Sequence, residues 1–554
     1  MKPVVALALL YLVLIQPNHP QAMTWGALAV FPLELPVIVA TLIALGRSWA
    51  GTALRIALVA VLWAVAVLKL ADFATFTAFN RGFNLMVDYH LAPAGWMLAK
   101  GTLGTGLAGL ALAAGLLGLL ALGYALWWAT GVLAGLPVPR LARPVALALV
   151  PLLLIPPVAE IGAARGVWVL PENLRPPGAA FTARVGLERV EQAIAARVDL
   201  ARFQAAAMAD PMRGQTPLFD RLGGRDLILI YVESYGRSSY ENPLYAATHT
   251  STLRTAQQSI ADTGLAMRSG WARAPMVGGQ SWLSHGSVAS GMWLDTQSRY
   301  RALLASPRRT LFHFAQQAGR RSVAIMPAHV LPWPEGAYFG FDAIYNAPDL
   351  GYRGQPFNWV TMPDQFTLTA FERLELSRRD RAPLVAQVVL VSSHAPWVPV
   401  PEMVPWDAVG DGRIFDQWAL SGDPPEVVWR DHDRVRDQFR QAIDYSLRTV
   451  GAWAARQGGD PDKAPLILVL GDHEPARFVS GTEDYDVPLH LIGPPDLVSL
   501  FDGLGWAEGM LPDPASPSTP MDALRDLLLT RLGSGASAGP DTQASAYTPQ
   551  GRAP

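Results

Sequence analysis

Four side chains that can bind a cation follow apolar runs of the sequence. Glu233 follows "LILIYV", His394 follows "LVAQVVLVSS", and the neighbours Asp472 and His473 follow "LILVLG". Apolar runs of this length are typical of buried strands, and ligands of parallel sheets bind beyond the carboxyl ends of the strands. Oxygen and nitrogen donors without sulfur suit a divalent cation such as Zn²⁺ or Mn²⁺. The sequence therefore predicts a cation site at one edge of a sheet.

Each of these donors also has an ordinary structural explanation. A carboxylate after a strand often caps the next helix, and a single histidine there is often a packed or surface residue. What favours a cation site is that all four donors stand at strand ends of one domain.

A glycine-rich stretch supplies candidate nucleophiles. "MVGGQSWLSHGSVASGMW" leads into a predicted helix, whose N-terminal N–H groups can hold an anion. A serine of this stretch can attack phosphorus when a metal lowers the pKa of its hydroxyl. The candidates are Ser281, Ser284 and Ser287. A glycine turn followed by ordinary serine caps is the competing interpretation.

The elements that must position these residues are short strands that alternate with helical patterns. Apolar runs with β character begin at positions 227, 321, 384, 466 and 489. This alternation predicts an α/β domain with a mainly parallel central sheet.

Residues 3–160 are almost continuously apolar and predict an α-helical transmembrane bundle. A bilayer core of about 30 Å needs roughly 20 apolar residues in a helix. The predicted spans are one short run, 3–15, and four longer runs, 27–45, 53–70, 103–133 and 145–158. The expected domains are a five-span domain over 1–165, a linker with a juxtamembrane amphipathic helix over 166–220, a catalytic domain over 221–533 and a disordered tail over 534–554.

Basic residues predict the orientation of this bundle. The short connections on one side carry Lys2, Arg47, Arg55, Arg140 and Arg143. The longer loop over 72–100, on the other side, carries only Arg81 and Lys100. The positive-inside rule places the N-terminus in the cytoplasm and the chain after residue 160 outside.

Composition excludes several classes of protein. The chain of 554 residues has a net charge of −2 and no basic stripe interleaved with aromatics, so a nucleic-acid partner is not expected. It contains no cysteine, which excludes disulfides, thiolate metal sites and cysteine nucleophiles.

The order of the motifs along the chain resembles that of a known superfamily. The motifs are "YVESYG", "GGQSWLSHGSVASG", "FGFD", "MPDQFTL", "VSSHAPW" and "LGDHEPA". They are similar to those of the alkaline phosphatase superfamily, and within it to the membrane-bound sulfatase-like branch of lipoteichoic acid synthases, phosphoglycerol transferases and phosphoethanolamine transferases. This resemblance implies a transmembrane bundle followed by a sulfatase-like α/β domain.

The resemblance implies a role for each cation donor. Glu233 of "VES", and Asp472 and His473 of "GDH", match metal ligands of the family. His394 of "SSH" matches a histidine that contacts the transferred phosphate.

Ser281 matches the nucleophile of the family, which is usually a threonine and which also contacts the metal. Serine keeps the hydroxyl, and Ser284 and Ser287 stay as alternatives. No C/S-x-P/A-x-R motif surrounds Ser281, so hydrolysis of sulfate esters is not expected. Lipoteichoic acid synthases carry a Trp-Asn-Arg stretch that contacts glycerol phosphate, and only Trp333 of "LPWPEGAYFGFD" matches it.

Other residues of this half are assigned to the framework of the domain or to its pocket. The histidines His285, His313 and His490 are assigned to the framework, His329 is a candidate substrate contact, and Trp282, Trp333 and Trp397 are candidates for the pocket lining.

The resemblance implies a phosphotransferase that depends on Mn²⁺, Zn²⁺ or Mg²⁺. It would move a phospholipid head-group phosphate, of the phosphoglycerol or phosphoethanolamine type, to a cell-envelope glycan or lipid through a serine-linked intermediate. It would span the bacterial inner membrane several times, with the catalytic domain in the periplasm or outside. Two alternatives stay open: a phosphodiesterase or phosphatase that uses water as acceptor, and a non-catalytic membrane-bound binding module.

Overall fold

The computed structural model describes residues 1–554 except 80–81, 84–90, 140, 379, 461 and 536–554. Arg81 and Arg140, used above for orientation, lie outside the described residues, as does the predicted tail apart from its first two positions. The chain forms two compact units, Met1–Asp199 and Leu200–Pro554, and the division falls within helix α8 (Phe181–Met208).

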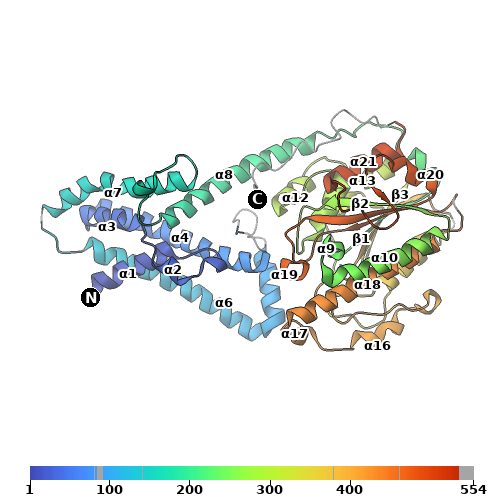
Figure 1. The fold of residues 1–554 in the computed structure, drawn as a ribbon, viewed down its shortest axis with the longest axis horizontal. Helices are drawn as coiled ribbons and strands as arrows, with labels where there is room; N and C mark the ends of the chain where they lie inside the picture. Colours follow the sequence, from blue (N-terminus) through green and yellow to red (C-terminus); the bar gives the residue numbers. More distant parts are fainter. Residues whose placement is uncertain (80–81, 84–90, 140, 379, 461, 536–554) are drawn as a thin grey trace. The chain divides into compact units, whose positions relative to one another are not determined.

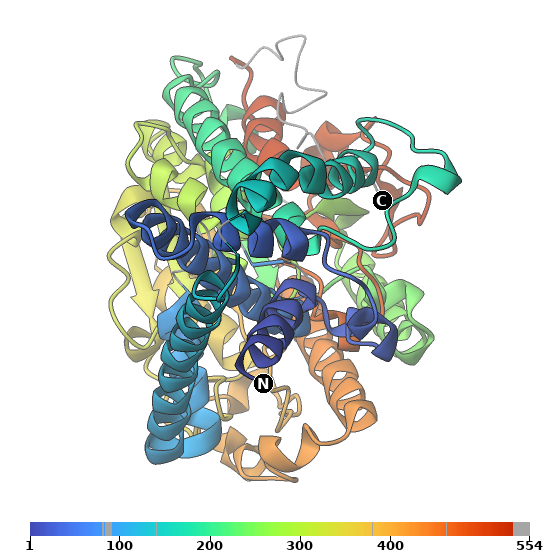
Figure 2. The same cartoon turned by 90° about the vertical axis from the view of Figure 1, so that its left-hand side faces the viewer.

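The first unit is built of apolar helices. They are α1 (Lys2–Ile15), α2 (Trp25–Leu28), α3 (Glu34–Leu45), α4 (Trp49–Phe79), α6 (Leu91–Ala134) and α7 (Ala142–Ala164). Within this unit α3 packs against α7 and α1 packs against α6 (Figure 2). Among the described residues, three stretches are long and apolar enough to cross a membrane: Trp49–Phe76, Gly104–Ala134 and Ala142–Ala164.

These helices indicate a membrane protein, but two of the five predicted spans are short. Helix α1 has 14 residues and α3 has 12, whereas a perpendicular span needs about 20. The run predicted over 27–45 is also not one helix. Leu33 donates its N–H to Ala179 O at 3.1 Å, and this pairing separates α2 from α3 at Pro32. Proline cannot donate an N–H to a helix, so the break falls beside it.

The first half of α8 is anchored within the first unit. Ala180 and Val185 are buried, and the Thr182 hydroxyl donates to Leu14 O at 2.6 Å. Arg184 pairs with Glu160 at 2.9 Å. The amphipathic helix predicted here is therefore packed on one side, and further along its length Phe203 and Ala207 are buried in the second unit.

The second unit contains one mixed sheet of nine strands within the part of the chain that the structure describes. They are β1 (Leu227–Val232), β2 (Ala266–Arg273), β3 (Arg321–Met326), β4 (Ala343–Asn346), β5 (Leu384–Leu390), β6 (Leu466–Gly471), β7 (Asp486–Gly493), β8 (Ala507–Glu508) and β9 (Ser518–Pro520). Their order is β4-β3-β5-β1-β6-β7-β2-β8, and β9 pairs with β2.

All five predicted strands exist, as β1, β3, β5, β6 and β7. The five strands β4, β3, β5, β1 and β6, which are neighbours in this order, are mutually parallel. Strand β7 runs antiparallel to β6, and β2 runs antiparallel to β7. The predicted parallel centre of the sheet is confirmed. The carboxyl ends of β5, β1 and β6 therefore meet at one edge.

Helices cover both faces of the sheet (Figure 1). Helices α10 and α18 lie together on one face, and α13 and α21 lie on the other. The helices of this unit are α9 (Ser238–Glu241), α10 (Pro243–Ala261), α11 (Ser281–Ser290), α12 (Gln297–Leu304), α13 (Leu311–Gln317), α14 (Gly336–Phe339), α15 (Asp364–Phe371), α16 (Asp416–Ala419), α17 (Pro425–Val428), α18 (His432–Arg456), α19 (Arg477–Ser480), α20 (Pro495–Val498) and α21 (Leu524–Leu532).

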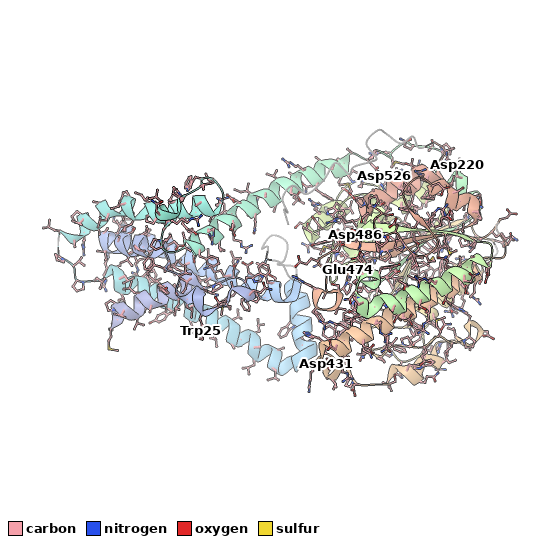
Figure 3. All side chains as sticks on the ribbon, in the orientation of Figure 1. Trp25, Asp220, Asp431, Glu474, Asp486 and Asp526 are labelled. Carbon is pink, nitrogen blue, oxygen red and sulfur yellow. The ribbon has the colours of Figure 1, made fainter. Side chains whose placement is uncertain are left out.

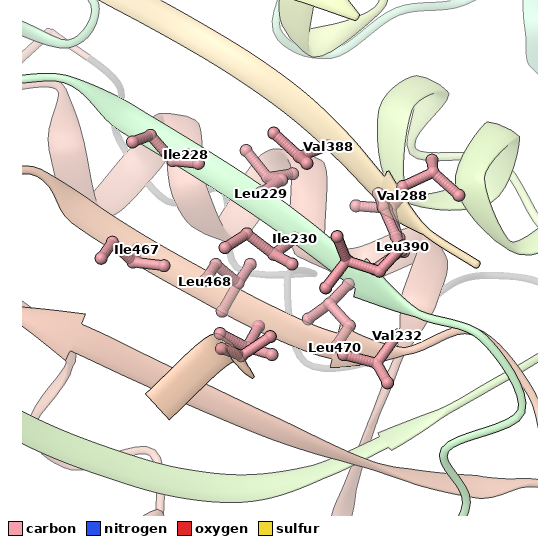
Figure 4. Close-up of a cluster of buried hydrophobic side chains, with 14 of the residues drawn as sticks. Ile228, Leu229, Ile230, Val232, Val288, Val388, Leu390, Ile467, Leu468 and Leu470 are labelled. Atoms are coloured by element: carbon pink, nitrogen blue, oxygen red, sulfur yellow. The ribbon is translucent and has the colours of Figure 1, made fainter. Parts of the chain in front are cut away.

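The core is densest around the central strands. Every residue of β1, β5 and β6 is buried, because helices pack on both faces. Figure 4 shows Ile230 of β1 beside Leu468 of β6, with Val388 from β5 nearby. This packed centre holds the strand ends in fixed positions relative to one another.

Candidate active site

The strand register brings the predicted donors together. Val232, the last residue of β1, pairs with Leu390 of β5 and with Gly471 of β6. Glu233 and Asp472 are the next residues of two adjacent parallel strands. Their side chains therefore leave the sheet at the same level.

The donor atoms form one compact cluster. His473 Nε2 lies 3.1 Å from Glu233 Oε1 and 3.9 Å from Asp472 Oδ1. Ser281 Oγ lies 2.9 Å from Glu233 Oε2 and 3.4 Å from His473 Nε2. Glu233, Asp472 and His473 are buried, and Ser281 is half-buried. The structure therefore brings the four residues expected at the metal and the nucleophile into one site.

Backbone contacts fix the Asp472–His473 pair. Asp472 Oδ1 accepts the N–H groups of Ser234 and His473, both at 2.8 Å. The His473 Nδ1–H donates to Glu474 O at 2.8 Å. This bond occupies Nδ1, so Nε2 faces the cluster, and a cation bound there would take the Nε2 lone pair in place of a proton.

The glycine-rich loop places Ser281 at the start of α11. Gly278 has a φ of 77° and Gly279 has a φ of 138°, a backbone that side chains rarely adopt. Gly278 also donates its N–H to Glu474 O at 2.8 Å, which ties this loop to the residue that follows His473. The loop thus turns sharply and presents Ser281 as the first residue of the helix.

The two alternative serines differ from Ser281 in burial and in hydrogen bonding. Ser287 is fully buried and donates its hydroxyl to Leu283 O at 2.8 Å within α11. Ser284 is also fully buried, whereas the Ser281 hydroxyl is bonded directly to Glu233. The geometry favours Ser281 over both.

Without a cation, protons have to balance the charge of the two buried carboxylates in this cluster. Burial, followed by the neighbouring Glu233 carboxylate, raises the pKa of Asp472 well above its usual range. Burial alone would lower the pKa of His473, but Asp472 and Glu233 raise it to about 10. Two buried carboxylates therefore require a positive charge beside them. A divalent cation bound here would supply that charge.

The residues present fit such a cation. One ligand atom from each of Glu233, Asp472 and His473 lies within 4.8 Å of the others. Asp472 Oδ2 is buried and finds no hydrogen-bond partner among the described residues. Two carboxylates and an imidazole without sulfur suit Zn²⁺ or Mn²⁺.

His394 stands at the open side of this cluster. The neighbouring Ser393 hydroxyl donates to Glu233 O at 2.6 Å, which ties the loop after β5 to the loop after β1. His394 itself is exposed, and its Nδ1–H donates to Ala395 O at 2.5 Å. This bond engages Nδ1 and not Nε2.

Trp333 is packed in a cluster of aromatic rings. Its ring lies 5.2 Å from that of His329 and 5.3 Å from that of Phe339, between centroids. Trp333 is half-buried, and its packing against other aromatic rings indicates a structural role. Within the described part of the chain, the ring contacts of Trp333 are with His329, Phe339 and Phe341 and not with the cation ligands.

Asp364, at the start of α15, supports the site and had no role in the sequence-based prediction. Its Oδ1 accepts the N–H groups of Val391 and Ser392 at 2.8 Å, and its Oδ2 accepts the Ser446 hydroxyl at 2.6 Å. These bonds close the turn that carries His394. The motif "MPDQFTL" marked this segment in the sequence. The role of its aspartate follows from the structure, because a fully buried carboxylate needs donors around it.

No family model and no curated protein matches the chain. Solved structures similar to it include a lipoteichoic acid synthase from Listeria monocytogenes, with 14% identity, a TM-score of 0.38, and coverage of 60% of this chain and 77% of that one. The soluble domain of the lipooligosaccharide phosphoethanolamine transferase A from Neisseria meningitidis has 12% identity, a TM-score of 0.40, and coverage of 56% and 87%. A phosphonate monoester hydrolase from Agrobacterium radiobacter has 15% identity, a TM-score of 0.33, and coverage of 56% and 73%.

A protein in the alkaline phosphatase superfamily from Vibrio parahaemolyticus is also similar, with 18% identity, a TM-score of 0.36, and coverage of 60% and 74%. Likeness at these identities and TM-scores assigns no activity to this chain.

Replacing Asp364 by alanine is expected to destabilise the second unit by several kcal/mol. Three buried donors lose their acceptor, and each unsatisfied group costs about 1–3 kcal/mol. Asp364→Asn keeps an acceptor at Oδ1 and is expected to cost less than half as much. Urea unfolding of the full chain, followed by tryptophan fluorescence, measures the difference. Equal midpoints for the two variants would contradict the role assigned to Asp364.

Proposed function

We propose that the protein is a membrane-anchored, metal-dependent phosphotransferase that moves a phospholipid head-group phosphate to a cell-envelope glycan or lipid. The observation that carries this proposal is the hydrogen bond of 2.9 Å from the Ser281 hydroxyl to Glu233 within a cluster of cation donors. A hydroxyl beside two carboxylates and an imidazole is the arrangement that an activated oxygen nucleophile needs.

Glu233, Asp472, His473 and Ser281 are the residues that would hold the cation. A divalent cation in this position lowers the pKa of a hydroxyl and offsets the charge of phosphate oxygens. Glu233 Oε2 accepts the Ser281 hydroxyl and so offers the first acceptor for its proton. Asp472 Oδ1 accepts the backbone N–H of His473, and Glu474 O accepts its Nδ1–H, so the ring is held with Nε2 toward Glu233.

In the first step Ser281 Oγ attacks the phosphorus of a phospholipid. The bond between Oγ and phosphorus forms, and the bond from phosphorus to the diacylglycerol oxygen breaks. Diacylglycerol leaves after its oxygen takes up a proton. His394 is exposed beside the site. We propose that it contacts the phosphate during this step.

In the second step a hydroxyl of the acceptor attacks the same phosphorus. The bond from the acceptor oxygen to phosphorus forms, the Ser281 ester bond breaks, and Ser281 recovers a proton. Water in place of the acceptor would make the same two steps a hydrolysis.

Exposed apolar side chains support a lipid as the donor. Trp282 follows Ser281 directly, and Leu331 lies two residues after His329. Trp429 Nε1 donates to Pro396 O at 3.1 Å, two residues after His394. The exposed fractions run from 40% for Trp429 to 74% for Leu331.

A further exposed tryptophan belongs to the same set. Trp359 is 69% exposed, and the adjacent Asn358 donates its Nδ2–H to Val398 O at 2.7 Å in the loop after β5. We call Trp282, Leu331, Trp359 and Trp429 the apolar rim. Exposed tryptophan and leucine side chains suit the boundary between lipid head groups and acyl chains.

Ser281→Ala is expected to reduce release of diacylglycerol from phospholipid vesicles by at least about 10³-fold, because it removes the nucleophile. Purified protein is incubated with vesicles of labelled phosphatidylglycerol or phosphatidylethanolamine under Mn²⁺, Zn²⁺ or Mg²⁺. The wild type is expected to form a head-group phosphate adduct on Ser281 that mass spectrometry detects.

Ser284→Ala serves as the matched control, since that hydroxyl is fully buried and it is Ser281 that is bonded to Glu233, and it is expected to keep wild-type turnover. Steady release of free head-group phosphate without any acceptor would show that the protein is a hydrolase and not a transferase. No turnover of either lipid by the wild type, under any of the three cations, would remove the enzymatic proposal.

Replacing two rim residues together, Leu331→Ser with Trp359→Ser, is expected to slow turnover of vesicle lipid by at least about 10-fold. Burial of each large apolar side chain contributes about 1.5–3 kcal/mol. Turnover of the water-soluble diester bis(4-nitrophenyl) phosphate is expected to stay at the wild-type rate. An equal loss on both substrates would show that the rim acts on the site and not on the lipid.

A further inference from the structure

Three polar atoms beside the predicted cation ligands are buried and have no hydrogen-bond partner among the described residues. They are Asp472 Oδ2, His285 Nε2 and the Tyr231 hydroxyl. Asp472 and Tyr231 are fully buried, and His285 is 8% exposed. Buried polar groups almost always have a partner, so three such atoms in one place point to a bound species.

The two oxygens of Asp472 differ in what they bind. Oδ1 already accepts two backbone N–H groups, from Ser234 and His473. Oδ2 is therefore the oxygen that is available to a cation. His285 Nε2 lies 3.9 Å from Asp472 Oδ2.

The position of His285 follows from helix α11. It lies four residues after Ser281, and residues at this spacing share one face of a helix. Its ring packs on the ring of Tyr231 from β1, with centroids 4.2 Å apart. Helix and strand together thus hold the imidazole toward Asp472.

We propose that His285 is a further ligand of the cation held by Glu233, Asp472 and His473. The inference rests on the cation site of the proposed function and adds to it a second imidazole. The helix that presents the nucleophile would then also bind the cation one turn later, so that the cation fixes Ser281 relative to the two carboxylates.

Among the described residues, the donor atoms within 4.8 Å of one another are those of Glu233, Asp472 and His473, and His285 is related to this group through Asp472 Oδ2, 3.9 Å from its Nε2. A cation shared with His285 would therefore lie on the Oδ2 side of Asp472. The separation of 3.9 Å is too long for a hydrogen bond between His285 and Asp472, which would be about 2.7–3.2 Å. Two ligands that bind one cation at about 2.0–2.2 Å each can be up to roughly 4 Å apart. A buried water between His285 and Asp472 is the alternative to a shared cation. The number of imidazoles bound to zinc distinguishes these two cases.

X-ray absorption of the full-length protein loaded with Zn²⁺ counts the imidazole ligands directly. The wild type is expected to show two imidazoles on zinc, from His285 and His473. His285→Gln is expected to show one imidazole and a Zn²⁺ affinity lower by about 10- to 100-fold in calorimetric titration. His432→Gln, which changes an exposed histidine outside the cluster, is the matched control and is expected to keep both values.

Other outcomes separate this inference from the proposed function. One imidazole in both the wild type and His285→Gln overturns the inference, whether or not the affinity changes, and leaves the site of Glu233, Asp472 and His473 in place. Absence of any zinc binding by the wild type overturns the proposed cation site itself. Thermal unfolding without Zn²⁺ shows that His285→Gln is folded, and His285→Ala repeats the count if it is not.

Discussion

Two carboxylates buried next to each other govern the architecture of this site. Glu233 is 5% exposed and Asp472 is fully buried, and each follows a strand in the middle of a packed sheet. Unpaired charge in such a place is costly, and two charges of the same sign are costlier. The imidazole of His473 lies against both carboxylates and offsets part of this cost. A divalent cation would offset the rest, which is why the site is best understood as a place for a cation.

Groups that are not predicted cation ligands hold that arrangement in place. Backbone N–H groups orient Asp472, a carbonyl orients His473, and Asp364 closes the turn beside His394. Glu474, inside the second unit (Figure 3), accepts both the N–H and the hydroxyl of Ser238 at 2.7 Å. Loops from four different elements are thus tied together behind the site, so the ligand atoms keep their geometry when substrates enter.

Much of this could be predicted from the sequence, for a physical reason. Residues that follow adjacent parallel strands share an edge, so the meeting of Glu233 with Asp472 follows once the strands are recognised. The choice of Ser281 among three serines came from the resemblance to a family, and burial of Ser284 and Ser287 supports it. The role proposed for His285 had no sequence signal, because it depends on how α11 is rotated against the sheet.

In the first unit, too, some features could be predicted from the sequence and others could not. Its apolar runs marked the helices, but the break at Pro32 depends on pairing with Ala179, far along the chain. Local composition does not contain such a contact. The first half of α8 is likewise packed by Leu14 and Glu160, which belong to other helices.

The central claim is that Glu233, Asp472 and His473 hold one divalent cation. Anomalous diffraction from crystals grown with Mn²⁺ tests it most directly. A manganese peak within about 2.5 Å of a ligand atom of each of these residues is the result that we predict. Crystals with ordered side chains but without a peak at that position, at saturating Mn²⁺, would contradict the account.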